Sequence, residues 1–310
     1  MQSEIEQSYN SVQQLTNLDF SFSGTLQLNL RKSNLSNEDI DLIAKTISKL
    51  VNMRCLKINL QENFLLEKGT QRISDEIGKC INLQELEIIL FSNSIGEKGI
   101  YSVGQALKNL QNLTSLKLDL IQNEVDNQGV IQLVNGLNYC QNLTNLDLDL
   151  YMNGVGELGL LTILNFVGYH KRIQIFSLSQ QMNYGGELEN YEEFIQTNGK
   201  MCSSNLKTMN LSLQSFYSQN YVLSYISSIL ESSSILKNLV IHLRDVNRHL
   251  YHLSILGSKL RNCQNIVYLN LMGFCNYGFG YDYKRREQIQ KKFKIQIRKM
   301  KRLVQIKELI

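Results

Sequence analysis

The sequence has no proline and no tryptophan, and only 19% of its residues are charged. It also has no apolar run of the roughly 18 to 20 residues that a membrane-spanning helix needs, and its first residues are polar rather than signal-like. These absences predict a soluble, cytoplasmic protein. We attribute the missing proline and tryptophan to compositional bias and infer no site from them. Because 43% of the residues are hydrophobic, the chain can bury a continuous core without metals or disulfides.

Motifs of common catalytic and cofactor sites are missing as well. The sequence has no G-x-x-x-x-G-K-[ST] loop and no G-x-G-x-x-G after a strand. Its six cysteines include no C-x-x-C pair, and Cys80 and Cys140 occupy a repeat position where another copy has Leu110, so we interpret them as core residues. His249 and His252 could share a helix face, but no carboxylate pair or cysteine lies at a matching spacing. We predict no enzyme activity, no cofactor and no metal.

A repeat of about 30 residues runs through the chain. Runs of alternating apolar and polar residues begin at nine places, 30 apart except for one step of 33: Thr25, Cys55, Glu85, Ser115, Asn145, Ile175, Thr208, Asn238 and Tyr268. Such alternation is typical of a strand with one buried face, and it places Leu116 and Leu118 inside and Lys117 outside. Apolar residues at helical spacing follow each strand. Each repeat is therefore predicted to be a strand, a turn and a helix.

Asparagines and glycines recur in register with these strands. The asparagines are Asn63, Asn93, Asn123, Asn153 and Asn183, and the glycines, just before the helices, are Gly69, Gly99, Gly129 and Gly159. A side-chain amide that recurs in register can bond the turn backbone of its own and the adjacent repeat. We therefore predict that the asparagines form a structural ladder.

The repeat follows the pattern L-x-x-L-x-L-x-x-N, extended by two strand residues, at Leu113, Leu116, Leu118, Leu120 and Asn123. Over about residues 20 to 310 the chain thus resembles the leucine-rich-repeat family, and within it the ribonuclease-inhibitor-like class, which includes Ran GTPase-activating proteins. The resemblance implies an α/β solenoid, or horseshoe, with parallel strands on the concave face and helices on the convex face. Strands stack at about 4.8 Å and helices at about 8 to 10 Å, so such a stack should curve.

The ends of the chain are predicted to cap the solenoid. We expect an N-terminal cap over residues 1–24, nine repeats over 25–283, and a basic C-terminal capping helix with a terminal strand over 284–310. The apolar positions of the two expected end helices are Ile5, Val12 and Leu15 within 1–17, and Ile289, Phe293, Ile297 and Met300 in the tail. Alternation over 302–309 predicts a tenth, terminal strand with Leu303, Val304 and Ile306.

The tail is basic, with 11 Lys/Arg and 3 Asp/Glu from Tyr281 onward. We favour the solvated face of a cap, and the alternative is an acidic partner such as nucleic acid, an anionic membrane or an acidic protein surface. The lysines of that alternative are Lys291, Lys292, Lys294 and Lys299.

Two stretches break the repeat. The segment 180–204 is three residues longer than its counterparts and has Gln180 where leucine is expected. The loop after the ninth strand contains clustered aromatic residues: Phe274, Tyr277, Phe279, Tyr281 and Tyr283. They either bind a partner or cover the core of the last repeat.

The alternation also predicts which strand residues face away from the core. In chain order they are Gln27, Asn29, Lys57, Asn59, Glu87, Ile89, Lys117, Asp119, Asp147, Asp149, Ser177, Ser179, Asn210, Ser212, Val240, His242, Asn270 and Met272. Four of them, Glu87, Asp119, Asp147 and Asp149, form an acidic cluster beside Lys117. The carboxylates should repel one another unless a basic group lies opposite, so we predict that a basic protein segment binds there. The alternative is that solvated carboxylates keep an exposed sheet soluble.

Taken together, these patterns predict a non-catalytic scaffold for protein–protein interaction, as a structural or adaptor subunit of a larger intracellular assembly. The family resemblance implies an alternative, a GTPase-activating or enzyme-inhibiting regulator. Such activators use an exposed arginine or asparagine on a loop at the strand ends, and the sequence offers no distinctive one. The remaining alternative is anion or nucleic-acid binding through the basic C-terminal helix.

Overall fold

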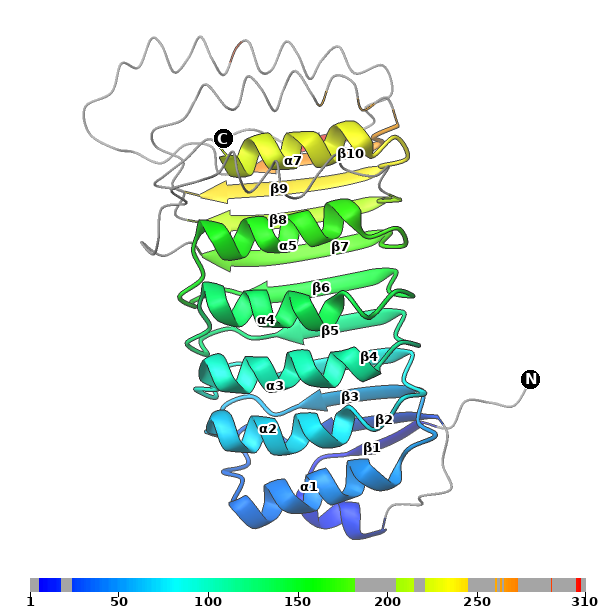
Figure 1. Cartoon of the computed structure of the whole chain (residues 1–310), viewed down its shortest axis with the longest axis vertical. Helices are drawn as coiled ribbons and strands as arrows, with labels where there is room; N and C mark the ends of the chain where they lie inside the picture. The colour runs from blue at the N-terminus through cyan, green and yellow to red at the C-terminus, as the bar shows by residue number, and fades with distance from the viewer. Residues whose placement is uncertain are drawn as a thin grey trace. The chain divides into compact units, whose positions relative to one another are not determined.

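The computed structural model describes residues 6–17, 24–181, 205–214, 221–244, 260, 263, 265–272, 291 and 305–307. The chain divides into two compact units, Met1–Gly154 and Val155–Ile310. Within each unit, strands form one layer and helices lie against one face of it (Figure 1). None of the helices in the described ranges is long and apolar enough to cross a membrane.

The first unit alternates strands with helices. Its elements are β1 (Glu6–Tyr9), the 3-10 helix η1 (Val12–Asn17), β2 (Thr25–Asn29), α1 (Asn37–Lys49), β3 (Cys55–Asn59), α2 (Leu66–Ile77), β4 (Glu85–Ile89), α3 (Gly96–Asn109), β5 (Ser115–Asp119), α4 (Asn127–Leu137) and β6 (Asn145–Leu150). All neighbouring strands pair in parallel, in the order β1-β2-β3-β4-β5-β6.

The second unit continues the same alternation over the ranges that the structure describes. Its elements are α5 (Glu157–Tyr169), β7 (Ile175–Gln181), β8 (Thr208–Gln214), α7 (Tyr221–Ser232), β9 (Asn238–Arg244), β10 (Tyr268–Met272) and β11 (Gln305–Lys307). These strands are also parallel, in the order β7-β8-β9-β10-β11. Strands β2 to β10 begin at the nine predicted residues, and β11 lies within the range 302–309 predicted for a terminal strand. The predicted fold class, an α/β solenoid of strand, turn and helix, is confirmed.

A constant register builds the core. Leu116 pairs with Leu86 on one side and Leu146 on the other, so equivalent residues of successive repeats lie side by side. The inward row of the first unit, Leu26, Leu56, Leu86, Leu116 and Leu146, is at most 3% exposed. The corresponding row of the second unit, Phe176, Met209, Leu239 and Leu269, is 0% exposed. Burial of these rows is the main favourable contribution to the fold, and no repeat could supply it alone.

The predicted asparagine ladder is present at Asn63, Asn93, Asn123 and Asn153, all buried. Asn93 Nδ2 donates to the carbonyl oxygens of Leu60 (2.8 Å) and Leu90 (2.9 Å). Asn93 Oδ1 accepts from the backbone N–H groups of Asn63 (3.1 Å) and Leu65 (3.2 Å). One side chain thus satisfies buried backbone groups of two successive repeats. Asn183, the fifth predicted member, lies outside the described residues.

A second asparagine ladder, which the sequence analysis did not identify, runs along the loops that precede the strands. The side-chain amide groups of Asn82, Asn112 and Asn142 donate to backbone carbonyls 31 residues earlier, at 3.1, 3.0 and 2.9 Å. These side chains are more exposed than those of the buried ladder, so water competes for their hydrogen bonds. Each bond should therefore contribute little to stability.

Glycines allow α3 and α4 to approach closely. A Cβ atom on Gly104 would lie 2.6 Å from the carbonyl oxygen of Gln132, and one on Gly136 would overlap the backbone of Gly104. Helices carrying ordinary side chains pack at about 8 to 10 Å. At this contact the two backbones meet without intervening side chains.

The N-terminal prediction was wrong in part. Residues 6–9 form the strand β1, paired with β2 from Glu6 opposite Thr25, instead of a helix. The physical reason is that the outer edge of β2 has unpaired backbone groups, and a short polar strand satisfies them. Val12 and Leu15 are buried as expected, at 5% and 1% exposure, within η1, which packs against α1.

We expect Asn93→Ala to lower the free energy of unfolding by about 3 to 5 kcal/mol, because it leaves several buried backbone groups without partners. Asn82→Ala is the matched control. It removes the same amide from the exposed ladder, where Nδ2 makes one bond of 3.1 Å, and should cost under about 1 kcal/mol. Urea denaturation of both variants measures the difference, and equal losses would contradict the distinction between the two ladders.

Candidate interaction surface

Two rows of side chains cross the open face of β4, β5 and β6, the face opposite the helices. Glu87, Lys117 and Asp147 pair across the three strands, and in the second row Asp119 pairs with Asp149. Lys117 and Asp147 are exposed, and the other three are half-buried. We call these five residues the charged sheet face. The alternation of the sequence therefore placed all five correctly.

Lys117 lies between carboxylates and bonds one of them. Its Nζ donates to Glu87 Oε1 at 2.7 Å. The pKa of Lys117 is raised, mainly by this hydrogen bond, and the negative charges of Asp147 and Asp119 add to the effect. The chain thus supplies part of the basic counter-charge that the sequence analysis assigned wholly to a partner.

The carboxylates of the charged sheet face differ in their surroundings. Asp119 Oδ1 accepts from the N–H of Ile121 (3.1 Å) and Asp149 Oδ1 from that of Tyr151 (3.0 Å), so both close the turn after their strand. Among the described residues, no hydrogen bond holds the Asp147 carboxylate. Surrounding protein atoms partly desolvate the Asp119 and Asp147 carboxylates and raise the pKa of both, while Lys117 lowers both. Ionised Asp147 is therefore the carboxylate of this face best placed to gain from an external cation.

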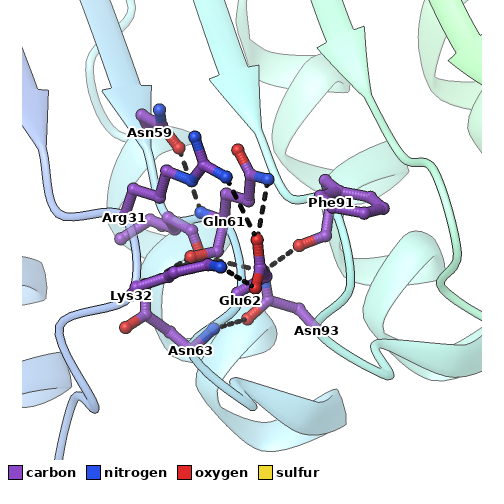
Figure 2. A network of polar contacts seen from close by, with 9 residues as sticks. Arg31, Lys32, Asn59, Gln61, Glu62, Asn63, Phe91 and Asn93 are labelled. Atoms are coloured by element: carbon purple, nitrogen blue, oxygen red, sulfur yellow. Dashed lines mark hydrogen bonds and ion pairs between the residues drawn. The ribbon is translucent and has the colours of Figure 1, made fainter.

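A separate polar network lies in the turns after β2 and β3 (Figure 2). Glu62 binds Lys32 at 2.8 Å and Arg31 at 3.4 Å, and it accepts from Gln61 Nε2 at 3.0 Å. These bonds, led by that with Lys32, lower the pKa of Glu62. No pattern in the sequence indicated this cluster, because its charged residues are not buried and their charges do not recur in the other repeats.

The turn after β3 also carries two exposed apolar side chains. Phe64 is 74% exposed and Leu66 is 54% exposed. Both have left-handed backbone, with φ of 53° and 57°. Comparison between repeats could have identified both residues. The residues 30 positions from Phe64 are Asn34 and Ser94, and those 30 positions from Leu66 are Ser36 and Gly96, all polar or glycine. The strand and helix patterns ignore such turn positions.

Other predicted surface residues have different outcomes. Asn270 on β10 is buried, at 7% exposure, whereas the alternation predicted it on the open face; its strand pairs with β11, with Asn270 opposite Lys307. Gln180 is buried at the expected leucine position and donates to the carbonyl of Val155 (3.1 Å). Lys291 is helical and exposed. The remaining predicted residues lie outside the described ranges and stay predictions: Phe274, Tyr277, Phe279, Tyr281, Tyr283, Lys292, Lys294 and Lys299.

The buried thiols are poor nucleophiles. Burial raises the pKa of Cys80 to about 11, of Cys140 to about 12 and of Cys263 to about 11. At neutral pH they are protonated, and they behave as core side chains. His170 ends α5 and packs against Phe166, with ring centroids 5.2 Å apart. Within the part of the chain that the structure describes, no group of His, Cys, Asp or Glu is placed to hold a metal ion.

Comparison with known proteins identifies no family for this chain. No protein-family model matches the sequence, and no curated protein matches it. The resemblance to leucine-rich-repeat proteins therefore rests on the residues of the repeat and on the fold that they form.

We expect Lys117→Met to raise the pKa of Asp147 and Asp119 further, because Lys117 lowers both. The free energy of unfolding at pH 7 should fall by about 1 kcal/mol or less, as for an exposed ion pair. A carboxyl group whose folded pKa is raised binds its proton more tightly in the folded state, so protonation stabilises the fold as pH falls through that pKa. The difference in the free energy of unfolding between wild type and Lys117→Met should therefore become smaller as the pH falls below neutral.

Side-chain NMR titration and denaturation at several pH values measure both effects. Lys57→Met is the control, since Lys57 faces Glu87 from the other side, on β3. An unchanged Asp147 titration in Lys117→Met would contradict the assigned coupling.

Proposed function

We propose that the protein is a non-catalytic interaction module of the leucine-rich-repeat kind, a structural or adaptor subunit of a larger intracellular assembly. The observation that carries the proposal is the open face of β4 to β6. The parallel register lines up charged side chains there, and the helices of this unit lie against the opposite face (Figure 1). An open sheet face with ordered side chains offers a broad contact area and no enclosed pocket.

A basic, extended protein segment is the partner that this face favours. Four carboxylates surround one lysine, and that lysine is already bonded to Glu87. A cation opposite Asp147 and Asp119 would offset their mutual repulsion and stabilise their ionised forms. The attraction should weaken with salt, because these charges lie at the surface.

We expect a synthetic peptide with lysines at alternate positions to bind the full-length chain, and a matched glutamate peptide not to bind. The double variant Asp119→Asn, Asp147→Asn should weaken binding by about tenfold, as measured by fluorescence anisotropy. Its fold should persist, since Asn59 at the position of Asp119 makes the same turn bond, to Gln61 N at 3.1 Å.

The control is Glu38→Gln, Asp75→Asn, which removes two exposed carboxylates from α1 and α2 and leaves the net charge equal to that of the test variant. Equal weakening in both would show that net charge alone attracts the peptide. A tagged chain that emerges without any partner from native extract at every salt concentration would contradict the interaction function itself.

A second candidate, activation of a small GTPase, draws on the family resemblance and on Arg31. This arginine follows β2, and its side chain is 51% exposed beside Glu62. If the chain is such an activator, it should stimulate GTP hydrolysis in a panel of small GTPases, and Arg31→Ala should abolish the stimulation. Arg72→Ala is the control, an arginine exposed on α2. No stimulation by the wild-type chain would exclude this candidate.

A further inference from the structure

The turn after β3 carries two exposed apolar side chains, Phe64 and Leu66, on left-handed backbone. Asn93 Oδ1 accepts from the N–H groups of Asn63 and Leu65, which flank Phe64. The two bonds fix the backbone of Phe64 at a φ of 53°, a conformation that bulky residues rarely adopt. Leu66 is fixed similarly, since its N–H donates to the carbonyl of Asn93 at 3.0 Å and its φ is 57°. The counterparts Asn34, Ser94 and Glu124 share the left-handed backbone of Phe64, whereas Ser36 and Asp126, at the position of Leu66, have φ of -77° and -111°.

The equivalent turns after β2, β4, β5 and β6 carry residues that suit the geometry or the solvent. The counterparts of Phe64 are Asn34, Ser94, Glu124 and Gly154, and the counterparts of Leu66 are Ser36, Gly96, Asp126 and Gly156. Asparagine and glycine adopt left-handed backbone at little cost, and polar side chains are solvated. Phe64 and Leu66 have neither property, and their exposure of 74% and 54% shows that packing within the chain compensates little.

Basic side chains border this apolar pair. Lys32 and Arg31 lie in the adjacent turn, and Glu62 accounts for one of their two charges. On the helix side Lys68 is exposed, and Lys98 is 3.3 Å from Glu67 with 82% of its side chain exposed. Arg31 and Lys32 share one carboxylate, so the adjacent turn after β2 keeps one positive charge that Glu62 does not compensate. A partner that fits must offer an apolar side chain with carboxylates around it.

We propose that Phe64 and Leu66, with Arg31, Lys32 and Lys68, form a docking site for an acidic protein segment that presents an aromatic or aliphatic side chain. We call these five residues the turn site. The inference extends the proposed interaction function to a second surface of opposite charge preference. It does not depend on the charged sheet face, which favours a basic segment.

The test is selection of short random peptides displayed on phage against the immobilised full-length chain. Enriched peptides should combine an aromatic or leucine residue with aspartate or glutamate. Phe64→Asn, which copies the residue at position 34, should weaken their binding by about tenfold, the loss typical of an anchoring aromatic. Lys32→Gln with Lys68→Gln should weaken it several-fold and reduce its salt dependence.

Met152→Gln is the matched control. Met152 is 51% exposed and has left-handed backbone in the turn after β6, with φ of 56°. It should leave binding unchanged. Asp119→Asn, Asp147→Asn should also leave it unchanged, so failure at the turn site is distinguishable from failure at the charged sheet face.

Thermal unfolding gives a second readout. Phe64→Asn should unfold at the same or a higher temperature, since it relieves the disfavoured backbone and removes an exposed ring. A lower unfolding temperature would show that Phe64 packs within the chain and would overturn the proposal. Three other results would do the same: no enriched peptide, enriched peptides that bind Phe64→Asn equally well, or self-association of the wild-type chain that Phe64→Asn abolishes, which would identify a second copy as the occupant.

Discussion

Amide groups that bond two successive turns at once hold the first unit in register. Each buried asparagine donates to carbonyls of its own and the preceding repeat, and its oxygen accepts from the preceding turn. A parallel sheet could slip by two residues and still bury alternate side chains, but the asparagines would then lose their partners. The spacing of 30 residues is therefore fixed by polar groups, while the leucine rows supply the burial free energy.

The same constraint fixes the shape of the turns. Around Phe64 and Glu124 the ladder binds the N–H groups on both sides of the turn residue, and both residues have left-handed backbone, as do Asn34 and Ser94. The turn geometry thus follows from residues of the neighbouring repeat rather than from its own sequence. This separation lets the fold display side chains at its turns that would not favour such a turn themselves. Phe64 is the clearest case, an exposed aromatic residue on left-handed backbone.

The register also determines the electrostatics of the charged sheet face. Equivalent positions of successive repeats become neighbours, so charges 30 residues apart interact more strongly than charges nearby in sequence. Lys117 bonds Glu87 and lowers the pKa of Asp147 and Asp119. The face is consequently an acidic surface that is partly neutralised by a lysine of the chain itself.

The sequence by itself determined the period, the first residue of each of nine strands, the four described members of the buried ladder and the outward charged residues of β4, β5 and β6. It could do so because burial imposes a periodic pattern that each repeat carries. Tertiary structure alone decided the pairing of β1, the exposed ladder through Asn82, the contact of Gly104 with Gly136, and the bond between Lys117 and Glu87. These features depend on which atoms of neighbouring repeats come within bonding distance, and a local pattern of apolar and polar residues does not specify that distance.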